Sequence, residues 1–239
     1  MIRAITFDFW NTLFAGVNAS HLRRRALRDA LHQLERIDVA DQRIEDAVAH
    51  AWQEWDRVWI EEQRTFGAAD WVSLVLAELA VNLDKAGREL LAQAMASSGM
   101  QAEPPLVDGL LDVLPRLAQR FRLAVICDTG LSPGWMLRKQ MEAHGIRSYF
   151  SHLTFSDELG VSKPHPRPFL TTLDQLGVSP SEAVHIGDYP RTDIAGAKAV
   201  GMRAVRFTGV YDWGNDPVAA DAAISSYDQL EPLLDKWNR

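Results

Sequence analysis

Cysteine is almost missing from this sequence. One residue, Cys127, occurs among 239, so no disulfide can form within the chain. Such sparse use is typical of a reducing compartment. No run of about 20 apolar residues occurs either, which predicts a chain without a membrane span. The short N-terminal apolar run is broken by Asp8 and has no cleavage pattern, unlike a signal peptide. These absences predict a cytoplasmic protein with no membrane partner.

Excess basic charge is also missing. The chain has 25 Lys and Arg residues against 32 Asp and Glu residues, which gives a net charge of -7. The densest basic stretch, Arg23-Arg24-Arg25, lies in a helical pattern and suits a solvated helix face. Because no basic stripe stands out, we expect no nucleic-acid partner. An acidic chain that handles an anionic substrate needs a metal ion or local positive charge at its site.

A long helical region follows the N-terminus. Between residues 16 and 102 the apolar residues recur at helical spacing and no convincing strand occurs. We expect four helices in this region, over residues 20–34, 41–64, 69–83 and 84–99. Glu103-Pro104-Pro105 then ends the pattern, because proline cannot continue a helix. Residues 16–102 are therefore interpreted as one helical insertion.

The remaining chain alternates short apolar runs with helical patterns. Strands are expected over residues 2–7, 123–127, 153–155, 183–187, 202–207 and 222–225. Helices are expected over residues 110–120, 133–144, 166–176, 191–200 and 227–237. Such alternation predicts an α/β fold, a doubly wound parallel sheet with helices on both faces. The first strand joins this sheet across the insertion, so residues 1–15 and 103–239 form one α/β core.

Four polar stretches are expected to lie at the ends of predicted strands. The carboxyl ends of strands converge on one edge of such a sheet, where ligands bind. A carboxylate there can accept a phosphoryl group, and a lysine and a divalent cation can meet the charge of that group. Mg²⁺ prefers oxygen ligands, which three aspartates could supply. The stretches are Asp8 to Thr12, Cys127 to Gly130, Ser162-Lys163-Pro164, and Gly187-Asp188 with Asp193.

In this order the four stretches resemble the motifs of the haloacid dehalogenase-like (HAD) hydrolase superfamily, with a helical cap of the first type inserted after motif one. The resemblance covers essentially the whole chain. It implies a Rossmann-like core, a cap over residues 16–102, bound Mg²⁺ and a small phosphorylated substrate. It also implies roles for individual residues. These are catalysis by Asp8 and Lys163, metal binding by Asp8, the backbone carbonyl of Trp10, Asp188 and Asp193, and substrate binding by Asn11, Thr129 and Gly130.

Motif one departs from the family pattern at Trp10, where family phosphatases usually have a second Asp that protonates the leaving oxygen. Such acid–base help is worth roughly 10² to 10⁴ in rate. Three interpretations follow. The protein acts on good leaving groups such as acyl or aryl phosphates, or the helical region supplies the acid through Glu61, Glu62 or Arg64, or the protein binds a phosphorylated ligand and turns over little.

Dehalogenases of the family also lack this second Asp and cleave carbon–halogen bonds without a metal. Trp10 keeps that alternative open for this chain. The acidic pair Asp188 and Asp193 argues against it, because metal-free chemistry does not need an intact cation site.

Several other residues allow more than one interpretation. Cys127 is expected as a small buried residue, and Thr129 and the amides after it could bind phosphate. His185 is expected to be packed or bonded to backbone, and His165 to lie on a surface loop. The aromatic stripe is typical of a packed core or of a face through which two copies pair, with a substrate pocket as the alternative. It consists of Trp52, Trp55, Trp59 and Trp71.

Overall fold

The computed structural model describes residues 1–35, 39–214 and 218–239. Within them the chain divides into two compact units. The first unit comprises Met1–Gly16, Pro104–Asp128 and Arg138–Arg239, and the second comprises Val17–Glu103 and Thr129–Leu137. The assignment of residues 16–102 to a cap domain stays a prediction.

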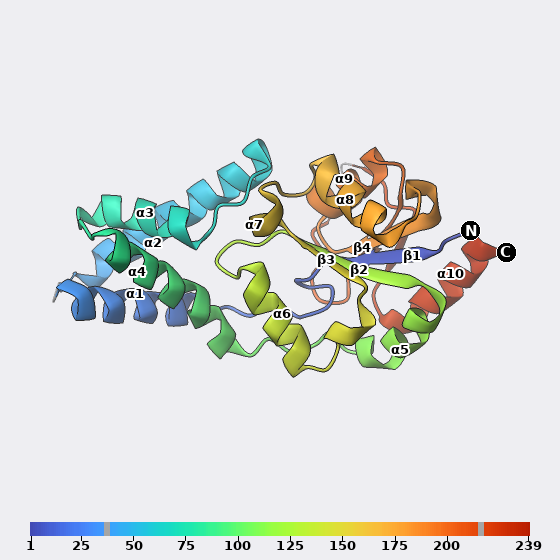
Figure 1. Ribbon diagram of the computed structural model, residues 1–239, viewed down its shortest axis with the longest axis horizontal. Coiled ribbons are helices and arrows are strands. Elements are labelled where there is room, and N and C mark those ends of the chain that lie inside the picture. The colour runs from blue at the N-terminus through green and yellow to red at the C-terminus, as the bar shows by residue number, and fades with distance from the viewer. Residues whose placement is uncertain (36–38, 215–217) are drawn as a thin grey trace. The chain divides into compact units, whose positions relative to one another are not determined.

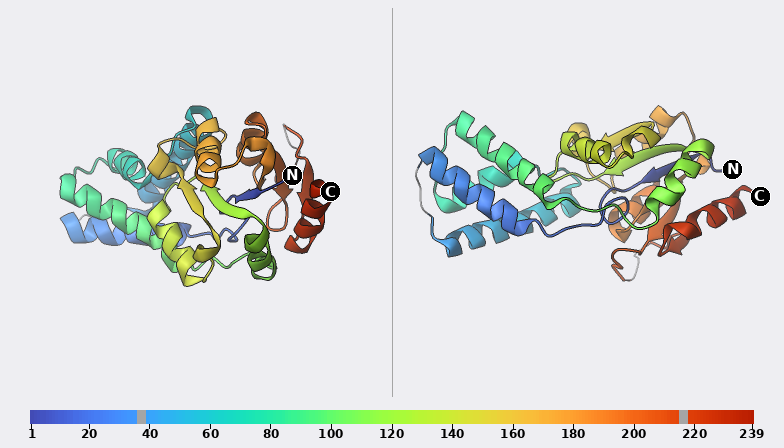
Figure 2. Two further views of the ribbon diagram at one scale, coloured as in Figure 1. Left: turned by 45° about the vertical axis from the view of Figure 1, so that its right-hand side comes forward. Right: turned by 90° about the horizontal axis from the view of Figure 1, so that it is seen from below.

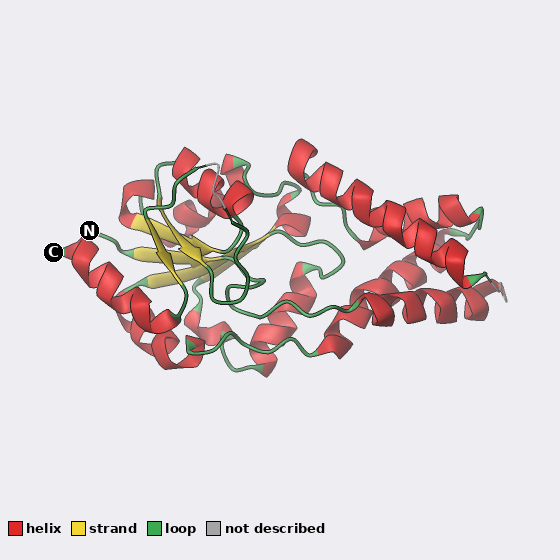
Figure 3. Ribbon diagram, turned by 180° about the vertical axis from the view of Figure 1, so that it is seen from behind, coloured by secondary structure: helices red, strands yellow, loops and turns green. Residues whose placement is uncertain are grey.

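A sheet, drawn in yellow in Figure 3, forms the centre of the first unit. It has six strands in the order β3-β2-β1-β4-β5-β6. Every neighbouring pair is parallel, and Phe7 at the end of β1 stands opposite Val125 and Ile186. This confirms the predicted doubly wound α/β fold. The strands are β1 (Ala4–Phe7), β2 (Arg122–Cys127), β3 (His152–Phe155), β4 (Ala183–Gly187), β5 (Arg203–Phe207) and β6 (Ala222–Ile224).

Helices flank this sheet on both sides. The helices α8 and α9 pack on one face through an apolar cluster that includes Phe169 and Ala197, and α5 and α10 lie toward the other face (Figure 1). Burying apolar surface of both faces in this way stabilises a parallel sheet. The helices are α5 (Leu110–Arg120), α6 (Gly134–Ala143), which crosses the boundary of the two units, α7 (Ser156–Leu159), α8 (Pro166–Leu176), α9 (Ala195–Ala199) and α10 (Leu230–Asn238).

The second unit is helical over its described residues. Its core is one apolar cluster in which Trp71 is buried, while Trp52 and Trp55 pack against the cluster with part of their surface exposed. Trp71 is therefore a core residue of this unit. The helices are α1 (Ser20–Glu35), α2 (Asp41–Arg57), α3 (Ala68–Leu79) and α4 (Lys85–Ser98), with a π-helical turn at Val58–Glu62 and a 3-10 turn at Gly99–Ala102.

Two helices differ from the sequence-based expectation. The helix expected over 41–64 leaves the α conformation after Arg57 and continues as a π-helical turn to Glu62. The helix expected over 191–200 begins as a π-helical turn, Pro190–Ile194, that leads into α9. A π turn widens the backbone locally and occurs often at functional sites. The four-residue α7 was not predicted, because a single turn has no detectable period.

The two chain ends lie side by side in the views of Figure 2. The side chain of Asn238 joins them, since it accepts a hydrogen bond from the Ile2 backbone N–H at 2.6 Å and donates one to the Ile2 carbonyl at 3.2 Å. None of the helices in the described ranges is long and apolar enough to cross a membrane.

Candidate active site

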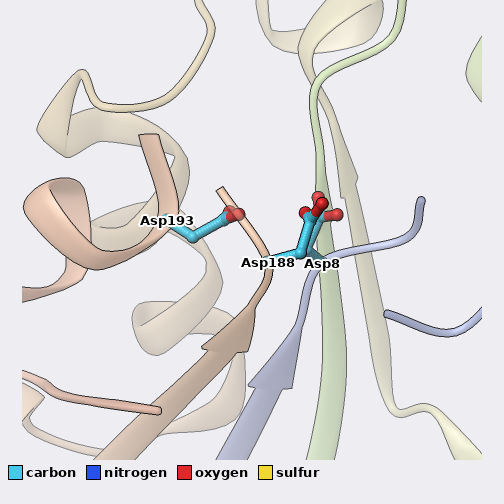
Figure 4. A group of neighbouring side chains, drawn as sticks. All are labelled: Asp8, Asp188 and Asp193. Atoms are coloured by element: carbon cyan, nitrogen blue, oxygen red, sulfur yellow. The ribbon is translucent and has the colours of Figure 1, made fainter. Parts of the chain in front are cut away.

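Three aspartates of the first unit meet where neighbouring strands end. Asp8 follows β1, Asp188 follows β4, and Asp193 lies in the π-helical turn beyond β4 (Figure 4). Each is buried, and one carboxylate oxygen from each lies within 4.8 Å of the others. The structure thus brings together three acids that are distant in the sequence.

Lys163 lies between two of these aspartates and is itself buried, with 1% of its surface exposed. Its ammonium group donates to Asp8 Oδ1 at 2.6 Å, to Asp193 Oδ1 at 2.6 Å and to the carbonyl of Ile126 at 3.0 Å. These three bonds use all three protons of the ammonium group. The backbone N–H of Lys163 donates to Asp128 Oδ1 at 2.9 Å, so Asp128, whose role was not predicted, holds the backbone at Lys163.

His185 also belongs to this network. It stands opposite Thr6 in the sheet, and its Nδ1 lies 2.8 Å from Thr6 Oγ1 while its Nε2 lies 3.1 Å from Asp193 Oδ1. Of the two expectations for this residue, packing is confirmed, because His185 is buried and lies edge-on to the Phe169 ring, while its ring nitrogens face side chains and not backbone. Burial lowers the pKa of His185 although the bond to Asp193 opposes the shift, and this favours the neutral ring. An ionisable residue inside an otherwise apolar strand was the only available sequence signal.

Gly187 makes room for Asp193. A Cβ on Gly187 would collide with the side chain of Asp193, which lies across the end of β4. The backbone of the following turn fixes that side chain, because Tyr189 N–H donates to Asp193 Oδ2 at 3.0 Å and Asp193 N–H donates to the Tyr189 carbonyl at 2.9 Å. Glycine at this position therefore lets the carboxylate point back toward Asp8.

Burial and mutual repulsion control the ionisation of the acids. Burial raises the pKa of Asp8 well above its usual value, although Lys163 opposes the shift. Burial and the charge of Asp193 raise the pKa of Asp188 to about 6. Burial alone would raise the pKa of Asp193, but Lys163 and His185 outweigh burial and lower it to about 2. For Lys163, the two aspartates outweigh burial and raise its pKa well above the usual value.

These groups suit a divalent cation. Three ionised carboxylates and one ammonium leave two uncompensated negative charges in a buried place, which is unfavourable. A cation of charge +2 would cancel them. Because the available ligand atoms are carboxylate oxygens, a hard cation such as Mg²⁺ or Ca²⁺ fits better than a soft one. The described residues could therefore hold a divalent metal.

Asn11 and Trp10 lie in the loop after Asp8. Asn11 adopts a left-handed conformation with φ of 55°, its Oδ1 accepts the Gly16 N–H at 3.0 Å and its Nδ2 donates to Asp188 Oδ2 at 3.2 Å. It thus supports the turn, and its contact with substrate stays a prediction. Trp10 is half-buried, with its ring edge-on to Phe9 at a centroid distance of 5.0 Å. Its carbonyl as a metal ligand also stays a prediction.

Thr129 and Gly130 group with the helical unit rather than with the aspartates. In that unit the indole Nε1 of Trp55 lies 2.6 Å from the place that a Cβ on Gly130 would take. Glycine is needed here because a larger residue would displace Trp55. The role of Thr129 and Gly130 in binding substrate stays a prediction. Cys127 is buried, and burial raises the pKa of its thiol well above its usual value, as suits an inert residue.

Two contacts at the site were not foreseen from sequence. The hydroxyl of Tyr227 donates to the carbonyl of Thr12 at 2.5 Å, and the indole N–H of Trp213 donates to Asp188 Oδ2 at 2.9 Å. Both residues lie beyond the four motif stretches, and no local pattern marks them.

The model of the haloacid dehalogenase-like hydrolases matches residues 2–201. The chain belongs to this family of hydrolases. A glyceraldehyde 3-phosphate phosphatase of Methanopyrus kandleri is 27% identical over 211 residues, which are 86% of this chain and 84% of that protein. A phosphoglycolate phosphatase of Rhodospirillum rubrum is 34% identical over 128 residues, which are 53% of this chain and 51% of that protein. Further phosphatases of the family align over about a third to a half of their length.

The fold of this HAD-like hydrolase also matches solved structures along its whole length. A 2-haloacid dehalogenase from Pseudomonas syringae superposes with a TM-score of 0.73 at 26% identity, covering 99% of this chain and 100% of the other. Relatives of both kinds, phosphatase and dehalogenase, thus share this architecture. The family identifies the chain as an enzyme, a hydrolase, while the choice of substrate depends on the residues of its own site.

Proposed function

We propose that this HAD-like hydrolase is a Mg²⁺-dependent phosphatase that acts through an aspartyl-phosphate on Asp8. The observation that carries the proposal is the buried cluster of Asp8, Asp188 and Asp193 around Lys163, with its two uncompensated negative charges. Metal-free chemistry does not need an intact cation site, so this arrangement favours the metal-dependent reaction. The phosphatase relatives support the same choice.

Asp8 is the nucleophile in this proposal. Lys163 donates to its Oδ1, which leaves Oδ2 to attack the phosphorus atom of the substrate. The bond to the leaving oxygen breaks as the aspartyl-phosphate forms, and water then attacks that phosphorus and releases phosphate and free Asp8. Each of the two displacements has a lower barrier than direct attack of water on the substrate would have. Lys163 keeps the attacking carboxylate in one orientation throughout.

Asp8, Asp188 and Asp193, with the carbonyl of Trp10, would hold Mg²⁺. When bound, the cation would offset the burial and the neighbouring negative charge that raise the pKa of Asp8, and it would stabilise charge on the transferring phosphoryl group. Trp10 cannot act as a general acid at the leaving oxygen, because the indole N–H is far too weakly acidic. We therefore expect activated substrates, such as acyl or aryl phosphates, to react faster than alkyl phosphates.

Asp8→Asn tests the proposal. Wild type and variant are assayed with and without Mg²⁺ on p-nitrophenyl phosphate, acetyl phosphate, 2-phosphoglycolate, glyceraldehyde 3-phosphate and 2-chloropropionate. Phosphate release by the wild type should need Mg²⁺ and fall by about 10³ or more in the variant, because the nucleophile is gone. Asp174→Asn, at an exposed position of α8, is the matched control and should keep full activity.

Other outcomes would support the alternatives. Halide release from 2-chloropropionate without Mg²⁺ would identify a dehalogenase. Binding of phosphate esters without turnover, unchanged in Asp8→Asn, would identify a phosphorylated-ligand-binding protein. Either result contradicts the proposed phosphatase. A cytoplasmic location and pairing of two copies through the helical unit remain part of the proposal, and gel filtration tests the pairing.

A further inference from the structure

One oxygen of Asp188 is held by two donors from outside the acidic cluster. Asp188 Oδ2 accepts from Asn11 Nδ2 at 3.2 Å and from Trp213 Nε1 at 2.9 Å. A carboxylate oxygen offers about two lone-pair positions, so these donors fill Oδ2. Oδ1 is then the oxygen of Asp188 that remains for a cation.

Trp213 reaches this site from the connection between β5 and β6, which also begins at the carboxyl edge of the sheet. An ion pair between Arg206 and Asp212 ties the connection to β5, and Asp212 Oδ1 accepts the Gly214 N–H at 3.0 Å. The direction of the indole is therefore set by bonds on both sides of residue 213.

The indole ring also contacts the rings of two tyrosines. The ring of Tyr189 lies edge-on at a centroid distance of 4.6 Å, and that of Tyr211 lies edge-on at 4.5 Å. Such aromatic pairs are worth about 0.5–1.5 kcal/mol each beyond the area that they bury. The ring is thus fixed although 47% of the surface of Trp213 is exposed.

An exposed tryptophan whose single polar atom points inward needs an explanation. Indole has one donor and no acceptor, and here the donor is used on the carboxylate of Asp188. Burial of apolar surface does not explain why the N–H of Trp213 points inward, because nearly half of the residue faces solvent. The contact instead resembles the outer hydrogen bonds that orient the ligands of metal sites.

We propose that Trp213 is a positioning residue for the divalent cation. Its indole N–H, together with Asn11, holds Asp188 Oδ2 so that Oδ1 faces Asp8 and Asp193. The inference rests on the proposed function, because it takes Asp188 as a metal ligand. Since coupling is reciprocal, a bound cation also stabilises the connection that carries Trp213.

Trp213→Phe tests this inference, because phenylalanine keeps a ring in contact with the tyrosines and removes the N–H. The dissociation constant for Mg²⁺, and for Mn²⁺ as a second probe, is measured by calorimetry and by the rise of the unfolding midpoint with metal. We expect binding about 10- to 100-fold weaker than in wild type. Trp237→Phe is the matched control, since Trp237 lies on α10 under Arg203, and it should leave the dissociation constant unchanged.

The outcomes separate this inference from the proposed function. Equal Mg²⁺ affinity in wild type and Trp213→Phe overturns the positioning role and leaves the phosphatase proposal intact. A variant that loses metal-free stability but keeps its Mg²⁺ affinity shows a structural role and overturns it too. A wild type that binds no divalent cation overturns both.

A measurement on the wild type alone completes the test. Amide hydrogen exchange of residues 208–214 is followed with and without Mg²⁺. Slower exchange with Mg²⁺ is expected, because the cation fixes the acceptor of Trp213. Unchanged exchange at a saturating Mg²⁺ concentration would contradict the inference.

Discussion

At the scale of single residues, hydrogen bonds already occupy most donor and acceptor positions of the charged side chains in the site. Lys163 has no spare proton, Asp193 is bonded through both oxygens, and Asp188 is bonded through one. Each carboxylate is therefore held in one orientation before any ligand arrives. Such preorganisation is what electrostatic catalysis requires, because the groups need not reorient during the reaction.

Asp188 should make the metal-free protein less stable at high pH. Its pKa is about 6 in the folded state, against 3.8 for an ordinary aspartate. Because the pKa of Asp188 is higher in the folded state than in the unfolded state, its ionisation destabilises the fold. This destabilisation is absent below about pH 4 and complete above about pH 6. Asp188→Asn should thus gain up to about 3 kcal/mol in free energy of unfolding at pH 8 and nothing at pH 4.

Urea denaturation in EDTA at both pH values measures this difference. The comparison with wild type matters, since other groups such as His185 also titrate in the range. Asp174→Asn, at an exposed position, should show no gain at either pH. An Asp188→Asn gain that is the same at pH 4 and pH 8 would show that charge burial is not its cause.

At the scale of elements, the turn after β4 has a shape that only glycine permits. Gly187 lets the side chain of Asp193 lie over the strand end, and the π-helical turn Pro190–Ile194 brings Asp193 back to it. The acids thus depend on one short segment for their geometry. Adding a single methyl group in this segment should therefore change the positions of the carboxylates at the site.

Gly187→Ala should cost about 1–3 kcal/mol in stability, the usual effect of overpacking. It should also weaken Mg²⁺ binding, because the new Cβ displaces Asp193. Thermal unfolding and calorimetric titration measure the two effects. Gly67→Ala is the matched control, since no atom lies within 4 Å of its added Cβ and the site should be unaffected. Normal Mg²⁺ affinity in Gly187→Ala would show that Asp193 does not depend on this glycine.

The strand β4 and the helix α8 match their expected bounds, because apolar runs and the glycine after Leu176 mark them plainly. Asp8, Lys163 and Asp188 could be placed at one sheet edge, since parallel strands carry their carboxyl ends together. Trp213 and Tyr227 could not, because a hydrogen bond between distant loops leaves no periodic signal in the chain.

At the scale of the whole molecule, the candidate metal site lies entirely within the first unit. All three acids, Lys163 and Trp213 come from its segments. The helical unit has its own apolar core. The cation should therefore stabilise one unit directly, and the effect should be local in the sequence.

Saturating Mg²⁺ should raise the free energy of unfolding by about 2.7 kcal/mol at a concentration of 100 times the dissociation constant. Hydrogen exchange should slow most around β1, β4 and the π-helical turn after β4, and least in α1 to α4. Mass spectrometry of exchanged peptides, with EDTA as the reference, measures this pattern. Protection confined to the helical unit would place the cation elsewhere.

The central place of β1 has a consequence for how the protein is made. β1 leaves the ribosome well before its two neighbours in the sheet, which begin only at Arg122 and Ala183. The loop after Asp8 reaches its final hydrogen bonding only after Tyr227 is synthesised, because the Tyr227 hydroxyl donates to the carbonyl of Thr12. A nascent chain thus carries its candidate nucleophile long before the residues that complete the site are synthesised.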